Sequence, residues 1–231
     1  MKKIAVLSGA GISVESGIPT FRGADGLWEG HDIMEVASPQ GWQKNPRLVL
    51  DFYNQRRKAA LAVEPNAGHR SLVDLEAHYE VVVITQNVDN LHERAGSSRI
   101  IHLHGELFQS RSTADERLVY KISGAELNWG DTCERGSQLR PNIVWFGEMV
   151  PMMEVAQQEV AAADVLIVVG TSLQVYPAAG LLYEAKENTP VYIVDPYTPD
   201  YAQRPTIHAI AEPASVGLPR LVKRLIKDVQ H

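Results

Sequence analysis

Short apolar runs separated by amphipathic stretches dominate the sequence. Most of the runs are continuous rather than alternating, which is typical of strands that are buried on both faces of a sheet. We therefore expect strands at Ile4–Leu7, Val81–Thr85, Ile100–Leu103, Ile143–Phe146, Val165–Val169 and Val191–Val194. Helical spacing of apolar residues predicts helices at Pro46–Ala62, His69–His78, Met152–Ala163, Ala178–Glu187 and Leu218–Val229. Asn45 is placed to cap the first of these helices. Strands that alternate with helices indicate a parallel α/β sheet.

Two stretches interrupt this alternation. Residues 22–62 hold a loop rich in Gly and Asp and then a long helix. A doubly wound fold would normally return to its second strand at this point in the chain. Residues 105–141 are polar and rich in turns, and they contain an expected hairpin of Leu118–Ile122 and Leu127–Trp129. We interpret both stretches as insertions that pack together as a small second domain, which makes the core domain discontinuous.

Composition and charge narrow the class of protein. Hydrophobic residues make up 45% and charged residues 22% of the 231 positions, as in ordinary globular proteins. The net charge is −6 and no run of Lys or Arg occurs, so we expect no nucleic-acid partner. The longest apolar runs are too short to span a bilayer, so we expect no membrane partner. Cys133 is the single cysteine, which excludes an internal disulfide and favours a cytoplasmic location.

The first expected strand runs into the glycine-rich segment Gly9–Ser13. Glycines in such a turn allow the backbone to approach a pyrophosphate, and a following helix N-terminus favours anionic oxygens. The third glycine of a dinucleotide fingerprint is missing, because position 14 is Val14, and no second strand ends in an acid about 20 residues later. These differences argue against a hydride-transfer site, and a simple tight turn is the alternative.

The loop Glu15–Gly23 mixes glycines, a proline, an aromatic residue and an arginine. A solvated loop has no need of Ile18 and Phe21, whereas a ligand lid uses Phe21 to shield a reactive centre and Arg22 to meet a phosphate. Simple packing of the loop explains the same residues equally well.

Polar residues follow several other expected strands, at the sheet edge where parallel sheets bind ligands. The segment Gln86–Asp89 offers amides and a carboxylate that suit a carboxamide and ribose hydroxyls, or that cap a helix. His102 and His104 share one face of a strand, and His104 is a candidate general base, although a lone histidine is more often structural. The segment Gly170–Ser172 suits phosphate or ribose contacts, or a plain tight turn.

Taken together, six segments resemble the sirtuin family of NAD-dependent protein deacylases. They occur in the family's order and cover nearly the whole chain. They are GAGIS (9–13), SGIPTFRG (16–23), TQNVDNLH (85–92), LHGE (103–106), RPNIVWFGE (140–148) and GTSLQVYPA (170–178). The resemblance implies a Rossmann-like α/β domain that binds NAD, formed by residues 1–24, 63–104 and 142–231. It also implies a smaller domain formed by two insertions, residues 25–62 and 105–141.

The resemblance assigns roles to individual residues. His104 matches the family's base, and Asn87 lies with it at the catalytic centre. NAD is implied as a consumed co-substrate, bound by Gly9, Ala10, Gly11, Ile12, Glu15, Thr20, Phe21, Arg22, Trp28, Gln86, Asn87, Asp89, Gly170, Thr171, Ser172, Asp195 and Ala214. The substrate is implied to contact Ala37, Tyr53, Arg56, Val144, Phe146, Gly147, Glu148, Val175 and Tyr176. The segment from Val144 to Glu148 is expected to pair with the peptide as an added strand.

The implied reaction removes an acyl group from a protein lysine. Nicotinamide leaves C1′ of the ribose, the acyl oxygen captures that carbon, and His104 takes a proton from the ribose hydroxyls. Water completes the reaction, and the products are nicotinamide, free lysine and 2′-O-acyl-ADP-ribose. We expect acylated proteins as partners of a monomeric enzyme. One alternative is another enzyme on the same scaffold, either an NAD glycohydrolase or an ADP-ribosyltransferase. The other alternative is a non-catalytic module that senses NAD or ADP-ribose. His104 and the segment RPNIVWFGE argue against both.

The chain departs from the family pattern at two places. Asp195 stands where many members have an Asn that contacts the adenosine ribose. The two Cys-x-x-Cys pairs that hold structural zinc in many sirtuins fall on Ser112, Asp115, Cys133 and Gly136. One thiolate and one carboxylate do not make a tetrahedral site, so we expect no zinc. A small apolar cluster is expected to take over the role of the metal, formed by Leu118, Tyr120, Leu127 and Trp129.

Tyr53 and Arg56 lie three residues apart on the expected helix Pro46–Ala62 and therefore share a face. A solvated helix face is the plain explanation of Arg56 and Arg57. In the family, this Tyr/Arg pair marks a subgroup that favours succinyl and malonyl groups, and Ala37 matches a small residue that leaves room for them. A guanidinium forms a bidentate pair with such a carboxylate. We therefore expect succinyl-lysine to be preferred and acetyl-lysine to be accepted.

Overall fold

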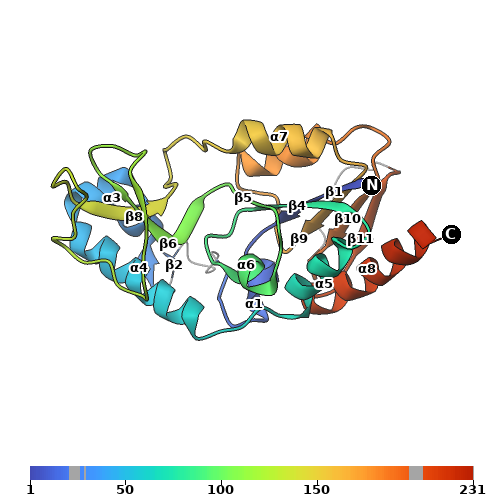
Figure 1. Ribbon diagram of the computed structural model, residues 1–231, viewed down its shortest axis with the longest axis horizontal. Coiled ribbons are helices and arrows are strands. Elements are labelled where there is room, and N and C mark those ends of the chain that lie inside the picture. The colour runs from blue at the N-terminus through green and yellow to red at the C-terminus, as the bar shows by residue number, and fades with distance from the viewer. Residues whose placement is uncertain (21–26, 29, 198–204, 231) are drawn as a thin grey trace.

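A six-stranded parallel sheet forms the core of the larger lobe of the protein (Figure 1). The computed structural model describes residues 1–20, 27–28, 30–197 and 205–230. The strands follow the order β11-β10-β9-β1-β4-β5 across the sheet. They are β1 (Lys3–Ser8), β4 (Glu80–Thr85), β5 (Ile100–His102), β9 (Val165–Val169), β10 (Val191–Val194) and β11 (Ile207–Ile210). The predicted parallel α/β sheet is thus confirmed. The edge strand β11 escaped prediction because its residues are at most partly buried.

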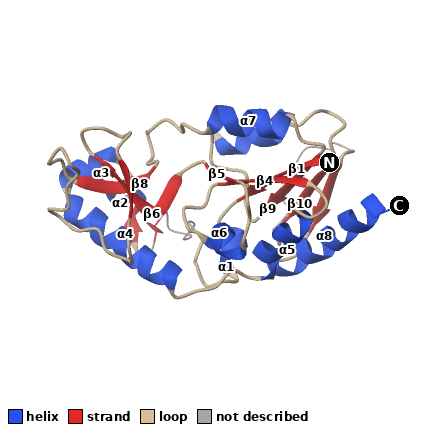
Figure 2. Cartoon of the chain, in the orientation of Figure 1, coloured by secondary structure: helices blue, strands red, loops and turns tan. Residues whose placement is uncertain are grey.

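Helices cover both faces of this sheet (Figures 1 and 2). One face carries α7 (Met153–Ala161) and the 3₁₀ helix η1 (Ala178–Glu184), and the other carries α1 (Gly11–Val14), α5 (Ala67–Leu75), α6 (Leu91–Ala95) and α8 (Ala214–Gln230). The Asn66 side chain caps α5 by accepting the Gly68 N–H at 2.9 Å. Among the described helices, none is both long and apolar enough to cross a membrane.

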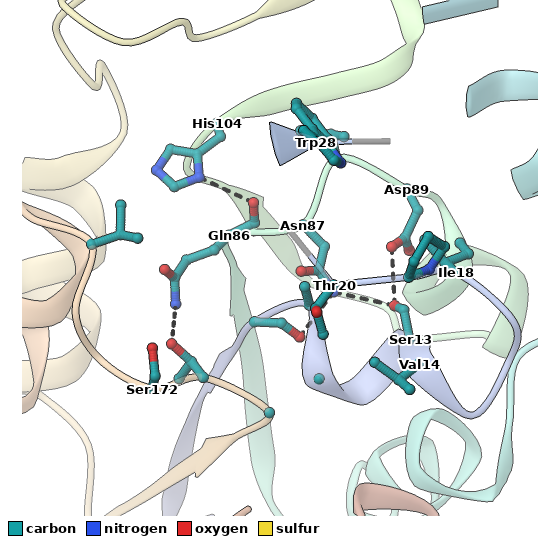
Figure 3. Close-up of a pocket in the computed structure, with 18 of the residues that line it drawn as sticks. Ser13, Val14, Ile18, Thr20, Trp28, Gln86, Asn87, Asp89, His104 and Ser172 are labelled. Atoms are coloured by element: carbon teal, nitrogen blue, oxygen red, sulfur yellow. Dashed lines mark hydrogen bonds between the residues drawn. The ribbon is translucent and has the colours of Figure 1, made fainter. Parts of the chain in front are cut away.

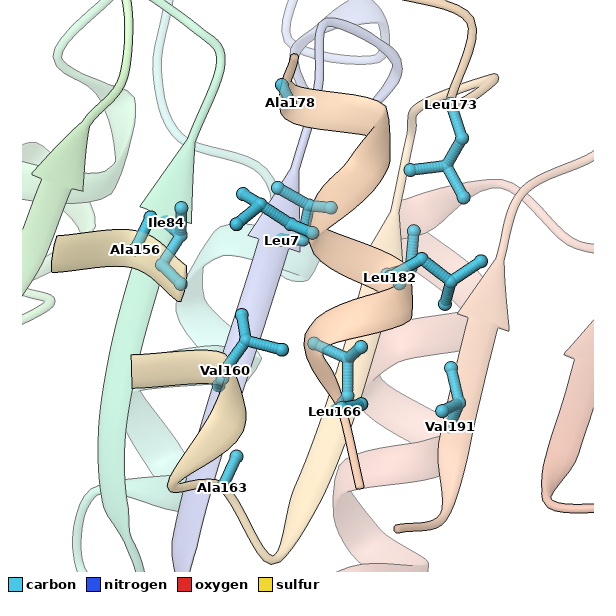
Figure 4. Close-up of a cluster of buried hydrophobic side chains, with 14 of the residues drawn as sticks. Leu7, Ile84, Ala156, Val160, Ala163, Leu166, Leu173, Ala178, Leu182 and Val191 are labelled. Atoms are coloured by element: carbon cyan, nitrogen blue, oxygen red, sulfur yellow. The ribbon is translucent and has the colours of Figure 1, made fainter. Parts of the chain in front are cut away.

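The continuous apolar runs are explained by burial on both faces of the sheet. Side chains alternate along β1, so that Ala5 and Leu7 join the core under α7 and η1, whereas Ile4 and Val6 join the core under α5 and α8. Figure 4 shows the first of these layers, in which Leu7 of β1 and Val160 of α7 belong to one buried cluster. This packing fixes the carboxyl ends of the strands, where the polar segments begin.

The smaller lobe combines helices with a three-stranded antiparallel sheet of order β7-β6-β8. Its helices are α2 (Ile33–Val36), α3 (Pro39–Lys44) and α4 (Pro46–Leu61). Its strands are β6 (Gly105–Ser112), β7 (Val119–Lys121) and β8 (Leu139–Ile143), beside a ribbon of β2 (Leu27–Trp28) and β3 (His31–Asp32). Asn45 caps α4 as predicted, by accepting the Leu48 N–H at 3.1 Å. The elements of both interrupting stretches lie together at one end of the molecule (Figure 1).

Two strand predictions in this lobe are wrong. β7 pairs with β6 and not with Leu127–Trp129. The side chain of Asn54 binds the carbonyl and the N–H of Leu127 at 3.2 and 3.0 Å, and so holds that segment on α4. The strand expected at Ile143–Phe146 ends at Ile143, as the last residue of β8. The carboxylate of Glu148 accepts the Trp145 N–H at 2.8 Å, which makes a turn where a strand was expected.

Direct contacts join the positions at which many sirtuins carry zinc ligands. The Cys133 thiol lies 3.3 Å from the Ser112 hydroxyl. Asp115 pairs with Arg117 at 3.0 Å and with Arg135 at 3.2 Å. The hydrogen bonds from Arg117 lower the pKa of the Asp115 carboxyl to about 2. The donor groups at these positions are therefore engaged with one another and with arginines.

An apolar cluster supports the same region of the smaller lobe. Leu127 and Cys133 are buried in it, and Leu118 and Tyr120 pack against it, so these parts of the prediction are confirmed. The prediction is wrong for Trp129, which is 49% exposed. Its ring lies under the guanidinium of an arginine of α4 at 5.6 Å, outside the cluster.

Candidate functional site

A cavity of about 900 Å³ lies between the two lobes, at the carboxyl ends of β1, β4 and β9. The strand β1 lies between β4 and β9. The chain therefore continues from β1 into the strands on one side of it, β4 and β5, and later adds β9, β10 and β11 on the other side. Such a switch point of a parallel sheet is where α/β folds bind ligands. The volume falls within the range of about 300–1,000 Å³ that is typical of ligand and cofactor pockets.

Two loops at the sheet edge of the cavity pack backbone against backbone. The N–H groups of Gly9 and Gly11 donate to the carbonyls of Val169 and Gly170 at 3.0 and 2.8 Å. A Cβ on Gly11 would stand 2.6 Å from Gly170 Cα, and a Cβ on Gly170 would stand 2.3 Å from Ile12 N. Gly170 also has a φ of +61°, which favours glycine. The glycines are therefore required by the contact between the two loops.

Buried polar side chains surround the middle of the cavity (Figure 3). The Ser13 hydroxyl donates to Asp89 Oδ2 at 3.0 Å. The Asn87 amide donates to Ser13 Oγ at 3.3 Å and to the Gly9 carbonyl at 3.2 Å. Asp89 is 7% exposed, and this burial raises the pKa of its carboxyl. The loop after β4 is therefore tied to the loop after β1 by side chains whose orientation is fixed.

His104 offers one ring nitrogen to the cavity. Its Nδ1 lies 3.0 Å from the Gln86 carbonyl (Figure 3), which only accepts hydrogen bonds, so Nδ1 carries the proton. Burial lowers the pKa of His104, and the bond to Gln86 opposes this in part. The ring is therefore neutral at neutral pH, with Nε2 able to accept a proton. The side chain of Gln86 donates in turn to the Thr171 hydroxyl at 3.1 Å.

His102 binds the same loop but is not a candidate base. Its Nδ1 lies 3.2 Å from the Asn87 carbonyl and its Nε2 lies 2.5 Å from a Glu93 carboxylate oxygen. Burial alone lowers the pKa of His102, but the Glu93 carboxylate outweighs burial and raises the pKa above its ordinary value. A carbonyl and a carboxylate both accept, so both ring nitrogens of His102 are placed to donate. The two histidines thus hold consecutive backbone carbonyls in place.

The far end of the cavity lies in the smaller lobe and has aromatic walls. Trp28 packs edge-on against Phe52 and Tyr53, with ring centroids 4.9 and 6.3 Å apart. The Arg56 guanidinium lies 4.2 Å above the Trp28 ring. Arg56, the fully buried Tyr53 and the small Ala37 all line the cavity. This end therefore combines apolar walls with a cation, which suits a chain that is apolar along its length and anionic at its tip.

Comparison with known proteins identifies the family. The model of the Sir2 family matches residues 9–177. The chain belongs to the Sir2 family. It is 56% identical over 227 residues to the NAD-dependent protein deacylase of Helicobacter pylori (strain ATCC 700392 / 26695), over 98% of this chain and 99% of that protein. A solved Sir2 homologue in complex with NAD matches with a TM-score of 0.89 at 38% identity, over 99% of this chain and 91% of that one. Sir2Af2 bound to a myristoylated histone peptide matches with a TM-score of 0.72 at 31% identity, over 98% and 93%.

Most residues that the Sir2 resemblance assigned to NAD or to the substrate line the cavity. They are Gly9, Ala10, Gly11, Glu15, Thr20, Trp28, Ala37, Tyr53, Arg56, Gln86, Asn87, Asp89, His104, Val144, Phe146, Gly147, Glu148, Gly170, Thr171, Ser172, Val175, Tyr176, Asp195 and Ala214. Ile12 is an exception, because its side chain is fully buried in the core beneath the sheet. Phe21 and Arg22 lie outside the described residues.

Several of the predicted carboxylates are engaged within the protein. Glu15 accepts hydrogen bonds from the backbone and hydroxyl of Ser215 at 2.9 and 2.5 Å, which ties the first turn of α8 to the loop after α1. Glu148 pairs with Arg140 at 2.7 Å. Asp195 accepts the backbone N–H two residues later at 2.8 Å, and burial raises the pKa of its carboxyl. The structural role of these side chains is thus visible, and their contacts with a ligand stay predictions.

The segment from Val144 to Glu148 forms one rim of the cavity. The N–H of Val144 donates to the His104 carbonyl at 2.9 Å, and the N–H of Phe146 donates to the Ala37 carbonyl at 3.0 Å. These bonds hold the rim against both lobes. The pairing of a substrate peptide with this segment stays a prediction.

Sequence reasoning missed several residues of the site. Ser13 belongs to the GAGIS motif, and a hydroxyl directly after the glycine turn was the available signal. Trp145 stands between two residues that were assigned to the peptide, and its inward position was not deduced. The other missed residues are mainly apolar and carry no chemical signal, as with Val88, Leu107, Ile143 and Val150.

Proposed function

We propose that the protein is an NAD-dependent protein-lysine deacylase that removes acetyl groups and, preferentially, succinyl and malonyl groups. One observation carries the proposal. A single cavity joins His104 and the polar loop Gln86–Asp89 in its middle to Tyr53 and Arg56 at its end. The proposed products are nicotinamide, free lysine and 2′-O-acyl-ADP-ribose. We further propose a cytoplasmic monomer that acts on acylated proteins and has no nucleic-acid or membrane partner.

The residues at the sheet edge suit NAD as the co-substrate. The loops Gly9–Ser13 and Gly170–Ser172 bring backbone and hydroxyl groups to the cavity. Gln86, Asn87 and Asp89 add the donors and acceptors that a carboxamide and ribose hydroxyls need. The names of the Sir2 relatives, and the solved relative that holds NAD, support this assignment.

The proposed reaction requires a base and an enclosed ribose carbon. NAD supplies an electrophilic carbon once nicotinamide leaves, and the acyl oxygen of the lysine amide captures that carbon. His104 Nε2 accepts a proton from the ribose hydroxyls, which allows a ribose oxygen to attack the acyl carbon. The lysine amine then leaves that carbon, and one water molecule adds to give 2′-O-acyl-ADP-ribose. Ile18 and Trp28 form apolar walls of the cavity that keep bulk water from the reactive carbon.

The preference for acidic acyl groups rests on Arg56 and Tyr53. Succinyl-lysine ends in a carboxylate, to which a guanidinium donates two parallel charge-assisted bonds and a phenol donates a third. Ala37 leaves room beside them, because it is a small residue in the cavity wall. Such a charged bond contributes about 1.5–3 kcal/mol, which is about 10- to 150-fold in kcat/KM. Acetyl-lysine gains none of these bonds and is therefore the poorer substrate.

The rival activities are separated by one measurement. Nicotinamide release is measured with NAD alone, with unmodified peptide and with acyl-lysine peptide. Release that depends on the acyl group supports the deacylase, whereas equal release without peptide indicates a glycohydrolase. The absence of release under all conditions indicates a sensor of NAD or ADP-ribose.

Replacing Arg56 by Met tests the acyl preference. We expect Arg56→Met to lower kcat/KM for a succinyl-lysine peptide by about 10- to 150-fold, because the charged bonds to the carboxylate are lost. Deacetylation is expected to change by only a few-fold. Lys58→Met is the matched control, since Lys58 lies on the same helix and its side chain is 61% exposed. Equal loss of both activities, or a variant that still prefers succinyl peptide, would show that Arg56 does not set the preference.

A further inference from the structure

The hydroxyl of Tyr53 accepts a hydrogen bond from a tryptophan, while its own proton has no acceptor in the part of the chain that the structure describes. Tyr53 is fully buried and lines the cavity. Its oxygen lies 3.1 Å from Nε1 of Trp145. An indole N–H only donates, so Tyr53 is the acceptor of this bond. Among the described residues, none accepts the Tyr53 proton. The proton of this buried hydroxyl can therefore be donated to an acceptor that enters the cavity.

Trp145 is held in one orientation from several sides. Its side chain is buried, and its backbone N–H donates to Glu148 Oε2 at 2.8 Å. The Arg140 guanidinium lies 3.4 Å from the centroid of its ring, and Glu148 fixes that guanidinium through bonds of 2.7 and 3.1 Å. Trp42 packs against the indole with a centroid distance of 5.8 Å. The direction of the indole N–H is therefore set by the surrounding structure.

The Tyr53 hydroxyl remains a donor throughout the working pH range. Burial raises the pKa of Tyr53 far above its usual value, and the bond from Trp145 and the charge of Arg56 reverse this only in part. Arg56 lines the same end of the cavity, one helical turn further along α4. Tyr53 and Arg56 thus both line the end of the cavity at which we place the acidic tip of the acyl group.

We propose that Trp145 is a positioning residue for acyl selectivity, whose indole N–H occupies the Tyr53 oxygen and so directs the Tyr53 proton to the carboxylate of an acidic acyl-lysine. This inference rests on the proposed preference for such acyl groups. A hydroxyl that accepts one hydrogen bond donates a stronger one, because each bond polarises the next. A donor that is already oriented also loses less entropy when the ligand binds. A neutral acetyl group offers no acceptor at this place and gains nothing from the arrangement.

The test removes the indole N–H of Trp145 and keeps an aromatic ring at that position. Trp145→Phe, Tyr53→Phe and the double variant are compared with the unchanged protein, using succinyl- and acetyl-lysine peptides with NAD. We expect Trp145→Phe to lower kcat/KM for the succinyl peptide about 3- to 10-fold more than for the acetyl peptide, the contribution of one neutral hydrogen bond. The difference is expected mainly in KM, because the bond serves the bound substrate as well as the transition state. In the Tyr53→Phe background, Trp145→Phe is expected to leave the succinyl-to-acetyl ratio unchanged.

Controls separate positioning from packing. Trp42→Phe disturbs the packing against Trp145 but leaves the bond to Tyr53, and it is expected to keep the substrate ratio. If Trp145→Phe does not fold, benzothienylalanine at position 145 keeps the shape of the indole and lacks its N–H. An equal loss for both peptides, or an undiminished effect in the Tyr53→Phe background, overturns the positioning role while the succinyl preference stands. An unchanged protein without any succinyl preference overturns the proposed function, and the positioning role with it.

Discussion

Replacing Arg57 by Met tests what holds the smaller lobe together. The guanidinium of Arg57 is fully buried and donates to the carbonyls of Ala125 and Leu107 at 2.8 and 3.0 Å and to the side-chain oxygen of Asn54. These acceptors lie in the loop before Leu127, in β6 and in α4. Burial lowers the pKa of Arg57 to about 10, which leaves it charged at neutral pH. One charged side chain therefore joins segments that are far apart in the sequence.

The expected loss of stability follows from these bonds. A buried acceptor that loses its donor costs about 1–3 kcal/mol, so the loss of three donors costs about 3–9 kcal/mol. Methionine fills part of the space and removes the cost of burying a charge, which offsets several kcal/mol. We expect a net decrease of about 3 kcal/mol in the free energy of unfolding. For a chain of this length, that corresponds to a decrease of about 6–12 °C in Tm.

The assay combines a global and a local measurement. Urea denaturation followed by tryptophan fluorescence gives the free energy of unfolding. Hydrogen exchange at the Leu127 amide, which donates to Asn54 Oδ1 at 3.0 Å, reports locally on the contact between this segment and α4. Lys58→Met is the matched control, because it removes an exposed ion pair with Glu126 at 3.4 Å and is expected to cost at most about 1 kcal/mol. If Arg57→Met and Lys58→Met unfold at the same urea concentration, the buried guanidinium of Arg57 does not stabilise the contacts between α4, β6 and the loop before Leu127.

Three further predictions concern the base and the metal. His104→Ala is expected to lower deacylation about 10²- to 10⁴-fold and to spare nicotinamide exchange, which precedes the proton transfer; a variant that keeps a tenth of the deacylation excludes the base role. Because burial lowers the pKa of His104, the acid limb of kcat/KM for deacylation is expected to have its midpoint below the ordinary histidine value of 6.5, as Nε2 gains a proton; a midpoint above 6.5 contradicts this. The protein is expected to keep its Tm in the presence of a chelator, since Asp115 and Cys133 are engaged with arginines and a serine; stoichiometric zinc in the purified protein refutes it.

The apolar pattern by itself determined the sheet and the place of the site. Runs such as Val81–Thr85 and Val165–Val169 are buried on both faces, so every residue in them is apolar or small and the strand is visible locally. The carboxyl ends of parallel strands meet at one edge, so the sequence alone predicts that the segments Gly9–Ser13, Gln86–Asp89 and Gly170–Ser172 lie together. Motif order supported the same grouping.

Only the tertiary structure decided which side chain meets which across the two lobes. The pairing of β7 depended on Asn54, which holds Leu127 from 73 positions away and so removes it from the expected hairpin. The Tyr53 hydroxyl received its donor from Trp145, which is 92 positions away. Local spacing predicts faces of helices and strands, because it describes periods of a few residues. Buried hydrogen bonds between distant segments depend on packing that closes only when the whole chain is folded, so no local pattern contains them.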